Sequence, residues 1–464
     1  MAHVPVPKTA NPLAMMWDDM RADRRAGVPW PPGELGFSFK RMRRFDRDPL
    51  GLLLESYERF GPVFTLHLFH HKAVFMLGPE ANHYILVSHA KNFLWREGHL
   101  RDLIPLLGDG LLTTDGSFHR THRKLMLPAF HREQITAAIA LMRAEVDEAV
   151  ERMRPGATVD LYDWTRRVAL RVAMRALFGI DPDTARAGGM NAAAEFEEAL
   201  SFYGRDYLLQ IPRGPYTPFW KLLRSRRRLD ELIYREIDRR TATGERGMDV
   251  LSLLLDARDE EGHSLSRRHV RDEVMTLLFA GHDTTTSTVS FLFYELARNP
   301  EIPDDPDVTV DMVVDETLRK YPPAYIGPRR AVETFEFNGV TVPGGAHVEY
   351  CSWASHHLPD VWPEPDAFRP ERFTEENKAK LPHGAYVPFG GGSRTCIGMR
   401  FGLAEVSVIT RAILARFRLE LQPGYELTIR HAPTISPKAG LPMRVRAADA
   451  AAMLGRAQEP VAAG

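Results

Sequence analysis

The stretch from Ser266 to Pro300 constrains the fold more than any other part of the sequence. Apolar residues recur with helical spacing from Val270 to Leu296, and Ser266 has the side chain of a good N-cap. Asn299 and the proline after it mark the other end, because proline disfavours helix in the preceding residue. At a rise of about 1.5 Å per residue, the predicted helix is roughly 50 Å long, so we expect it to cross the whole molecule.

The remaining apolar patterns predict further helices and a minor antiparallel β region. Helical spacing covers much of residues 134–154, 161–178, 220–240 and 398–417. Alternation and turn residues typical of β-hairpins occur at 62–78 and at 335–342, which contains Asn338-Gly339. Short strands are expected at 347–352, 418–421, 426–430 and 443–446. The sequence therefore predicts a mainly α fold with a minor antiparallel sheet.

Charge and cysteine usage exclude several classes of function. The 60 Lys+Arg residues nearly balance the 61 Asp+Glu residues, which gives no reason to expect a nucleic acid partner. Only two cysteines occur, Cys351 and Cys396, which argues against a secreted disulfide scaffold and favours a cytoplasmic location. Neither cysteine belongs to a CxxC pair, so we expect no structural zinc site.

The N-terminal residues have no pattern of a targeting or membrane segment. They contain no long apolar run, so we expect neither a signal peptide nor an integral membrane anchor. Met15, Met16 and Met20 can form a short apolar face beside charged residues. A loosely packed terminal arm is the preferred interpretation, ahead of a helix on a membrane surface.

The strongest chemical signal is the run FGGGSRTCIG at residues 389–398. Its glycines allow the backbone to pass close to a flat cofactor. Cys396 precedes a predicted helix, whose dipole and free N–H groups stabilise a thiolate. Arg394 can pair with an acidic group of the cofactor. A lone cysteine is otherwise most often a small buried apolar residue.

This run resembles the signature of the cytochrome P-450 superfamily. The fixed positions of the signature, and the Phe and Glu that follow it on the next helix, are matched by Phe389, Gly392, Arg394, Cys396, Gly398, Phe401 and Glu405. The resemblance implies the cytochrome P-450 fold of soluble bacterial members. Heme b (iron protoporphyrin IX) would lie between the long central helix and the cysteine-loop helix, with Cys396 as the metal ligand.

The resemblance also implies a division of the chain. It covers residues from about Asp48 to Arg446, so we expect a single haem-thiolate monooxygenase domain at 48–446. An N-terminal arm at 1–47 would precede it, and a C-terminal tail at 447–464 would follow. One departure is that only residues 301–315, with two prolines, separate the long helix from the next family motif, where relatives usually have more helix.

A second motif, Ala280-Gly281-His282-Asp283-Thr284-Thr285, lies in the middle of the long helix. Glycine, an acid and two threonines are poor helix formers, and a threonine hydroxyl can bond the carbonyl four residues back. Alone, the motif could be a buried kink without chemistry. The resemblance implies instead an oxygen-binding groove over the haem at Ala280 and Gly281. Thr284 would position dioxygen and water in a proton relay, and Asp283 would supply the protons.

Cationic partners for the two haem propionates are expected from several segments. The family pattern implies His119, Arg123 and Arg329 as cofactor-binding residues, and Arg330 competes for the role of Arg329. For His356, packing is about as good an interpretation as haem contact.

Three further residues resemble the structural network of the family. Glu316 and Arg319 lie three positions apart on a predicted helix, so they can form an ion pair. Arg372 would complete the network and help to brace the cysteine loop. We expect these three to have a structural role rather than a chemical one.

The activity implied by the resemblance is that of a monooxygenase. It would use O2 and two external electrons to hydroxylate or epoxidise a lipophilic small molecule, such as a fatty acid, terpenoid or steroid. The family's pocket regions are mainly apolar here, which favours such substrates. The pocket candidates are Ile104, Leu107, Phe202, Phe279, Ala324, Ile326 and Ile435.

Electrons from NAD(P)H are expected to arrive through a separate protein. No FMN-type, NAD-type or ferredoxin-like segment follows the haem region, so we expect a ferredoxin or flavodoxin-type donor with its reductase. A basic patch that steers an acidic donor would consist of Arg120, His122, Arg123, Lys124 and Arg400. An ordinary solvated charged face is an equally good interpretation of these residues.

Two alternatives belong to other functional classes. A peroxide-driven peroxygenase, or a haem-thiolate isomerase or dehydratase, would share the fold, but such relatives tend to lose the acid–threonine pair that Asp283 and Thr284 provide. A non-enzymatic haem sensor would need a sixth protein ligand, and none is evident from Ala280 to Thr285.

Overall fold

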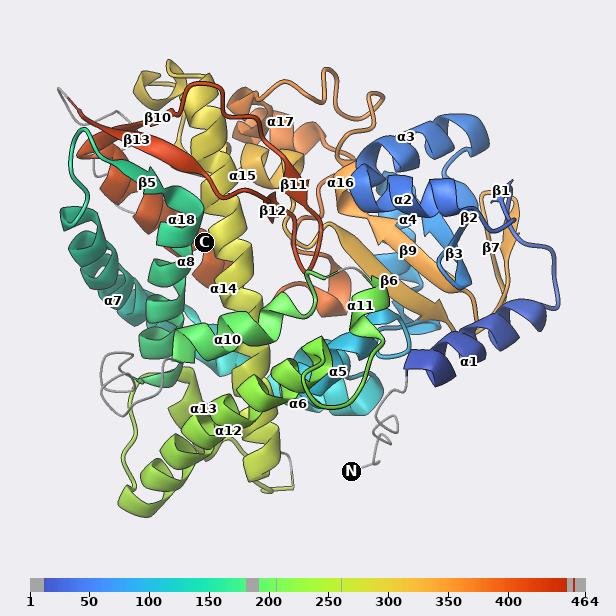
Figure 1. Cartoon of the computed structure of the whole chain (residues 1–464), viewed down its shortest axis with the longest axis horizontal. Coiled ribbons are helices and arrows are strands. Elements are labelled where there is room, and N and C mark those ends of the chain that lie inside the picture. Colours follow the sequence, from blue (N-terminus) through green and yellow to red (C-terminus); the bar gives the residue numbers. More distant parts are fainter. Residues whose placement is uncertain (1–11, 181–191, 206, 260, 449–453, 455–464) are drawn as a thin grey trace.

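The structure is a computed structural model that describes residues 12–180, 192–205, 207–259, 261–448 and 454 (Figure 1). Most of the expected tail, and the first residues of the expected arm, lie outside this part. The longer helices are α1 (Pro12–Arg24), α2 (Phe39–Arg47), α3 (Pro49–Phe60), α6 (Gly116–Met126), α7 (Arg132–Glu151), α8 (Leu161–Val172), α10 (Ala192–Ser201), α12 (Pro218–Thr243), α14 (Arg267–Arg298), α15 (Val310–Lys320) and α18 (Met399–Leu414). Shorter helices are α4 (Pro79–His83), α5 (Ile104–Leu107), α11 (Tyr207–Gln210), α13 (Val250–Asp256), α16 (Ser352–Ser355) and α17 (Glu375–Lys380).

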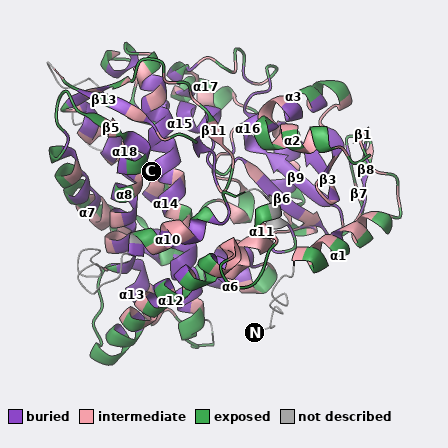
Figure 2. Ribbon diagram, viewed as in Figure 1, coloured by how far each residue is buried: buried purple, intermediate pink, exposed green. Residues whose placement is uncertain are grey.

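The central helix α14 organises the molecule. The Ser266 hydroxyl accepts a hydrogen bond from the backbone N–H of His269 at 3.1 Å, and Asn299 ends the helix, as the sequence predicts. Figure 2 shows α14 buried along most of its length. In Figure 1 this helix, in yellow, passes between α7, α8 and α18 on one side and the largest sheet on the other. The prediction of a long helix that crosses the molecule is confirmed.

The strands form one large sheet and three small ones. Their bounds are β1 (Gly33–Glu34), β2 (Val63–Leu68), β3 (His71–Met76), β4 (Phe93–Leu94), β5 (Thr158–Asp160), β6 (Ile326–Ala331), β7 (Phe335–Phe337), β8 (Val340–Val342), β9 (His347–Cys351), β10 (Phe417–Leu421), β11 (Ile429–Arg430), β12 (Ser436–Pro437) and β13 (Pro442–Ala447). The large sheet has the order β1-β2-β3-β9-β6-β4. Both predicted hairpins, β2–β3 and β7–β8, are confirmed.

The large sheet is mixed rather than purely antiparallel. The pairs β1–β2 and β3–β9 are parallel, and the second joins segments that lie far apart in the sequence. The alternation of apolar residues predicts that a strand exists, but it does not identify the strand that pairs with it. The smaller sheets, β10-β13-β5, β11-β12 and β7-β8, are antiparallel, as expected. The expected strand at 426–430 is shorter in the structure and forms only at Ile429–Arg430.

The apolar interior contains one large core, and two smaller cores lie on opposite faces of the large sheet. The large core contains residues of α7, α8, α12, α14 and α18. One of the smaller cores lies under the large sheet, where the rings of Phe291 and Tyr321 stack with centroids 4.3 Å apart. Between α14 and α15 the chain makes only one short 3-10 turn, Ile302–Asp304, in agreement with the shortened segment noted in the sequence. None of the described helices is both long enough and apolar enough to span a bilayer.

The described part of the N-terminal region is well anchored. Asp19, on α1, is 1% exposed and forms ion pairs with Arg101 at 2.5 Å and Arg330 at 3.1 Å. It also contacts His70 at 2.9 Å and His347 at 3.1 Å. Asp23, also on α1, accepts from the N–H of Lys72 in β3 at 2.8 Å. The expectation of a loosely packed arm was therefore wrong for α1, because the carboxylates of Asp19 and Asp23 tie this helix to the large sheet.

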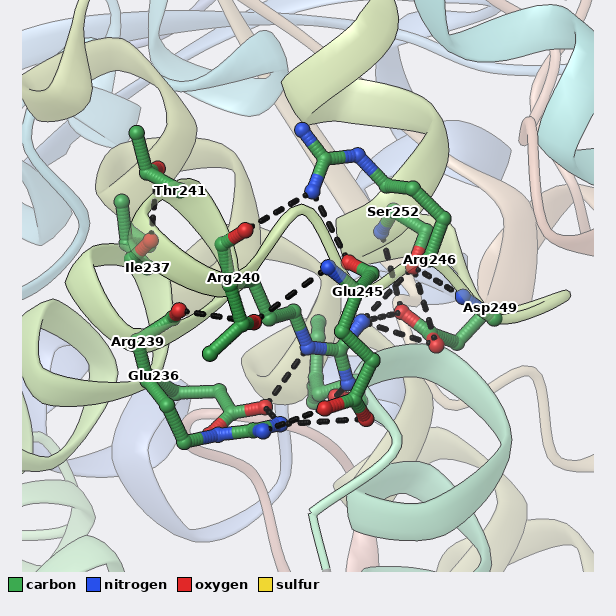
Figure 3. Close-up of polar contacts among 12 residues, drawn as sticks. Glu236, Ile237, Arg239, Arg240, Thr241, Glu245, Arg246, Asp249 and Ser252 are labelled. Atoms are coloured by element: carbon green, nitrogen blue, oxygen red, sulfur yellow. Dashed lines mark hydrogen bonds and ion pairs between the residues drawn. The ribbon is translucent and has the colours of Figure 1, made fainter.

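A polar cluster at the end of α12 fixes the turn into α13 (Figure 3). The guanidinium of Arg240 is buried and donates to both carboxylate oxygens of Asp249, at 2.7 and 2.9 Å. It also donates to the hydroxyl of Ser252 at 2.7 Å and the carbonyl oxygen of Phe178 at 2.8 Å. These bonds connect α12, α13 and the end of the α8 segment, so the cluster is structural.

Candidate functional site

Accessible surface in the middle of the molecule marks the site. Between Val270 and Leu296 of α14 most side chains are buried, yet Ala280 is exposed and Phe279, Gly281 and Thr284 are partly accessible. Cys396 is also accessible, although surrounding protein raises the pKa of its thiol by desolvation. Accessible groups within a desolvated interior indicate an internal hollow. The cysteine loop leads into α18, which packs against α14, so we infer that the accessible groups of both segments line one hollow between the central helix and the cysteine loop.

The backbone of the cysteine loop is tightly constrained. The N–H of Cys396 donates to the carbonyl oxygen of Phe389 at 2.9 Å, which closes the loop. Gly392 has φ 59°, and a Cβ there would lie 2.2 Å from the carbonyl oxygen of Leu86, so no other residue fits. The helix α18 begins directly after Gly398, whose N–H lowers the pKa of the Cys396 thiol against the larger effect of burial.

Two arginines and a tryptophan lie together beside this loop. The guanidinium carbon of Arg329 lies 3.6 Å from the ring centroid of Trp95, and that of Arg394 lies 5.0 Å from it. Arg394 pairs with Asp115 at 2.6 Å and donates to the carbonyl oxygen of Thr114 at 2.7 Å. Nothing in the sequence singles out Trp95, because none of the motifs identified above includes it.

The histidine and third arginine of the expected set lie near these groups. His119 is buried, and desolvation together with Arg394 and Arg123 lowers its pKa to about 3, so its ring is neutral at pH 7. Burial lowers the pKa of Arg123, and the negative charge of the nearby Cys396 thiolate raises it by a smaller amount. The structure therefore brings His119, Arg123 and Arg394 into one electrostatic neighbourhood with the cysteine.

The structure distinguishes Arg329 from Arg330. Arg330 contacts Asp19 at 3.1 Å and His347 at 2.5 Å, so it belongs to the anchor of α1. Arg329 is 2% exposed, and within the described residues its Nη2 has no hydrogen-bond partner. A buried guanidinium N–H without an acceptor is costly unless an anionic group completes it.

These residues fit a haem. Its two propionates are the acidic groups that Arg329 and its neighbours would bind, and the thiolate of Cys396 would serve as the ligand of its iron. The unpaired Nη2 of Arg329 and the accessible sulfur of Cys396 are the features of the structure that such a cofactor would satisfy.

The motif on α14 directs its polar groups in different directions. The hydroxyl of Thr284 donates to the carbonyl oxygen of Ala280 at 2.6 Å, which is the back-bonding that loosens a helical turn. Asp283 is buried, and Thr434 donates to its Oδ2 at 2.6 Å. Thr285 donates to Glu405 at 3.0 Å. Burial raises the pKa of Glu405 to about 8, so α18 meets α14 through an acid that tends to stay protonated.

The Glu316–Arg319 pair is fully buried and bidentate. Arg319 donates to the two carboxylate oxygens of Glu316 at 2.7 and 2.8 Å, and Arg372 lies 3.5 Å from the same carboxylate. Arg319 also donates to the carbonyl oxygen of His356 at 3.0 Å. His356 in turn accepts from the N–H of Val387 at 3.0 Å, just before the cysteine loop. His356 therefore has a packing role and connects the network to that loop.

The seven pocket candidates differ in accessibility. Ala324 is exposed, and Ile104, Phe279 and Ile326 are partly accessible. Leu107, Phe202 and Ile435 are buried in the apolar cores. The accessible four are the better placed to touch a bound molecule in this conformation.

The expected basic patch is smaller than the sequence suggests. Arg120, Lys124 and Arg400 are exposed. His122 is buried, with its Nδ1 2.7 Å from Glu273 of α14, so its inclusion in the patch was wrong. Nothing in the sequence shows that His122, which lies between the exposed cations Arg120 and Lys124 on the same helix, faces the interior.

Comparisons with known proteins agree with this geometry. The family model for cytochrome P-450 matches residues 29–305 and 309–440. Cyclooctatin synthase of Streptomyces melanosporofaciens is 34% identical over 372 residues, which are 74% of this chain and 79% of that protein. Cyclooctat-9-en-7-ol 5-monooxygenase of the same organism is 33% identical over 69% of this chain and 75% of its own length. The solved structure of retinoic acid-bound cyanobacterial CYP120A1 matches with a TM-score of 0.81 and 27% identity, over 91% of this chain and 100% of that one.

Proposed function

This chain belongs to the cytochrome P-450 family and is a monooxygenase; from that premise we propose that it hydroxylates or epoxidises a lipophilic terpenoid. The two relatives named for the cyclooctatin pathway support this substrate class ahead of fatty acids and steroids. The accessible pocket candidates are apolar, which suits a molecule with few polar groups.

The observation that carries the proposal is the accessible sulfur of Cys396 inside a desolvated interior. Burial raises the pKa of the Cys396 thiol, and the N–H of Gly398 and the cation of Arg123 act in the opposite direction, in favour of the thiolate that a haem iron binds. When bound through a thiolate, heme b supplies the activation of O2 and the insertion of one oxygen atom into the substrate.

Other residues of the chain hold the cofactor and manage protons. Arg329, Arg394 and His119 bind the propionates, and Arg123 lies near the thiolate. Ala280 and Gly281 leave room on α14, and the hydroxyl of Thr284 reaches the hollow from the same turn. In this proposal Thr284 orients the water from which a proton is taken, and Asp283 replaces that proton from its buried position.

Two electrons reach the site from a separate ferredoxin or flavodoxin-type protein, supplied by NAD(P)H through a reductase. The exposed cations of Arg120, Lys124 and Arg400 support a donor with an acidic face.

The first test uses the two cysteines as a matched pair. The Cys396→Ala variant should lose the thiolate-type absorption of the reduced carbon monoxide adduct, because the other cysteine, Cys351, is buried elsewhere and only a cysteine supplies a thiolate. Cys351→Ala is the control, since Cys351 is buried at the end of β9, and it should keep that absorption. An unchanged spectrum in Cys396→Ala overturns the ligand assignment.

The second test addresses the substrate class. Purified ferric protein is titrated with diterpene hydrocarbons and alcohols, retinoids, fatty acids and steroids, and the spin-state shift of the haem is recorded. A terpenoid should bind most tightly and give an oxygenated product with an electron donor and O2. Equal turnover with peroxide alone would favour a peroxygenase, and tightest binding of a fatty acid or steroid would contradict the terpenoid proposal.

A further inference from the structure

A C-terminal hairpin contacts α14 at the position of the buried acid. The residues between β11 and β12 run along α14, where Thr434 donates to Oδ2 of Asp283 at 2.6 Å. One turn further, the hydroxyl of Ser287 donates to the carbonyl oxygen of Ile435. The hairpin is therefore attached to the central helix by two hydrogen bonds, and only one of them involves the acid.

Asp283 has no other strong partner in the described structure. It is 2% exposed, and among the described residues no cation lies within ion-pair distance of its carboxylate. The ionisable groups that interact with it are Tyr162 of α8 and His282 of α14, and these two are in turn influenced by Arg166 of α8 and, for Tyr162, by Arg430 of β11. Arg430 is held elsewhere, because it donates to the hydroxyl of Tyr162 at 2.5 Å and to Ser436 at 2.9 Å.

The same hairpin touches the wall of the substrate pocket. The N–H of Ile435 donates to the carbonyl oxygen of Pro323 at 3.1 Å. Pro323 directly precedes Ala324, the most accessible of the pocket candidates. Residues 434–435 thus lie between the acid on α14 and a segment that a substrate would contact.

We propose that Thr434 is a positioning residue that holds the Asp283 carboxylate and ties its geometry to the wall of the substrate pocket. The inference rests on the proposed function. A hydroxyl that donates to a carboxylate stabilises the ionised form and fixes the direction of its oxygens. A substrate that displaces the segment at Pro323 and Ala324 would also move the hairpin and change the hydrogen bond between Thr434 and Asp283. The position of the Asp283 carboxylate then depends on how the pocket is filled.

The experiment compares three single substitutions in the full-length haem-loaded protein. Thr434→Val keeps the shape of the side chain and removes the hydroxyl, whereas Thr434→Ser keeps the hydroxyl. Ser287→Ala is the matched control, because it removes the other hairpin bond to α14 and leaves Asp283 untouched. Circular dichroism and the carbon monoxide adduct establish that each variant is folded and retains the thiolate ligand.

The direct readout is the infrared absorption of the acid itself. Difference spectra between the wild type and Asp283→Asn identify the carboxyl band of Asp283 by its absence in the variant. Thr434→Val should shift the frequency of this band, because the hydrogen bond to the carboxylate oxygen is lost. Thr434→Ser and Ser287→Ala should leave the frequency unchanged.

The second readout is the ratio of hydrogen peroxide to product, measured with substrate and electron donor. Thr434→Val should raise this ratio severalfold, and Thr434→Ser should restore it. Once Asp283 is changed to Asn, the additional Thr434→Val change should have no further effect on the ratio, because Thr434 acts through the acid.

Several outcomes overturn the proposal. An unshifted infrared band in Thr434→Val shows that the hydroxyl does not act on Asp283. A shift of equal size in Ser287→Ala shows that general anchoring of the hairpin is responsible, and additive effects in the double variant show that Thr434 acts on the substrate directly. A wild-type protein without a thiolate spectrum would instead disprove the proposed function, before any variant is compared.

Discussion

At the scale of single residues, burial decides which polar groups of the site keep their ordinary chemistry. Glu405 is 2% exposed, and its only described hydrogen bond comes from the hydroxyl of Thr285. One neutral donor does not replace the water that a carboxylate loses, so the pKa of Glu405 rises to about 8. His119 shows the converse, because burial among cations lowers its pKa to about 3 and keeps the ring neutral.

The raised pKa of Glu405 predicts a pH dependence of stability. The folded protein binds the proton more tightly than the unfolded chain, so this stability is complete below about pH 4.5 and declines as pH rises toward 8. The decline amounts to roughly 1.4 kcal/mol for each unit of pKa difference. Glu405→Gln should remove most of it, as urea unfolding at several pH values would show. The same slope in Glu405→Gln as in wild type would contradict this prediction, and Glu301→Gln, at an exposed position, is the control.

Thr284 carries a second prediction at this scale. Thr284→Ala should divert electrons into hydrogen peroxide, because in the proposed proton relay the Thr284 hydroxyl orients water and this variant lacks it. Thr286→Ala is the control, since Thr286 makes the same bond to the carbonyl four residues back but is fully buried. The ratio of peroxide to product should rise roughly tenfold or more in the first variant and little in the second. Full coupling in Thr284→Ala would exclude this residue from the proton relay.

At the scale of elements, local sequence patterns give helices and hairpins their bounds, and buried charges hold the elements together. Asp19 attaches α1 to the large sheet, Glu316 and Arg319 attach α15 to the segment before the cysteine loop, and Arg240 attaches α12 to α13. A buried charge without its partner is strongly unfavourable, so each pair specifies where its element must lie.

Two adjacent arginines test this argument. Arg240→Met should destabilise the protein by about 3–5 kcal/mol, because it leaves the Asp249 carboxylate buried without its cation. Arg239→Met is the matched control: Arg239 also pairs with Glu236, but on the exposed face of α12, so its loss should be much smaller (Figure 3). Denaturant unfolding of both variants measures the difference. Equal losses of unfolding free energy in the two variants would show that the burial of Arg240 does not make its ion pair more important for stability.

At the scale of the whole molecule, the balanced net charge conceals a local asymmetry. The chain carries 60 basic and 61 acidic residues, yet Arg120 and Lys124 are exposed on α6, near the cysteine loop, and Arg400 is exposed just after the cysteine. Such a cluster raises the rate of encounter with an acidic protein, and salt weakens the effect.

The last prediction concerns the exposed cations Arg120, Lys124 and Arg400, where the electron donor is proposed to bind. Lys124→Glu should slow electron transfer from an acidic ferredoxin severalfold at low ionic strength, and the difference should shrink as salt is added. Lys40→Glu makes the same charge change on α2, away from this face, and serves as the control. Stopped-flow reduction of the haem gives the rates. An equal decrease of the reduction rate in both variants would show that the net charge of the protein, rather than a local docking surface, controls the rate.

The sequence by itself determined the elements and motifs whose signals are local. Ser266 and Asn299 lie within a turn of the helix ends that they define, Asn338-Gly339 contains its own hairpin turn, and the cysteine signature is a single continuous run. These features depend on interactions between residues a few positions apart, so they can be predicted from the sequence.

Only the tertiary structure decided which distant groups satisfy the buried ones. The sequence pattern assigned the propionate role to Arg329 and left Arg330 as a competitor, and packing pairs Arg330 with Asp19 on α1. It proposed Asp283 as a proton source but gave no partner, and the structure supplies Thr434, 151 positions further along the chain. The physical reason is that a buried polar group must be paired by whatever the fold brings beside it, and sequence spacing does not record that neighbour.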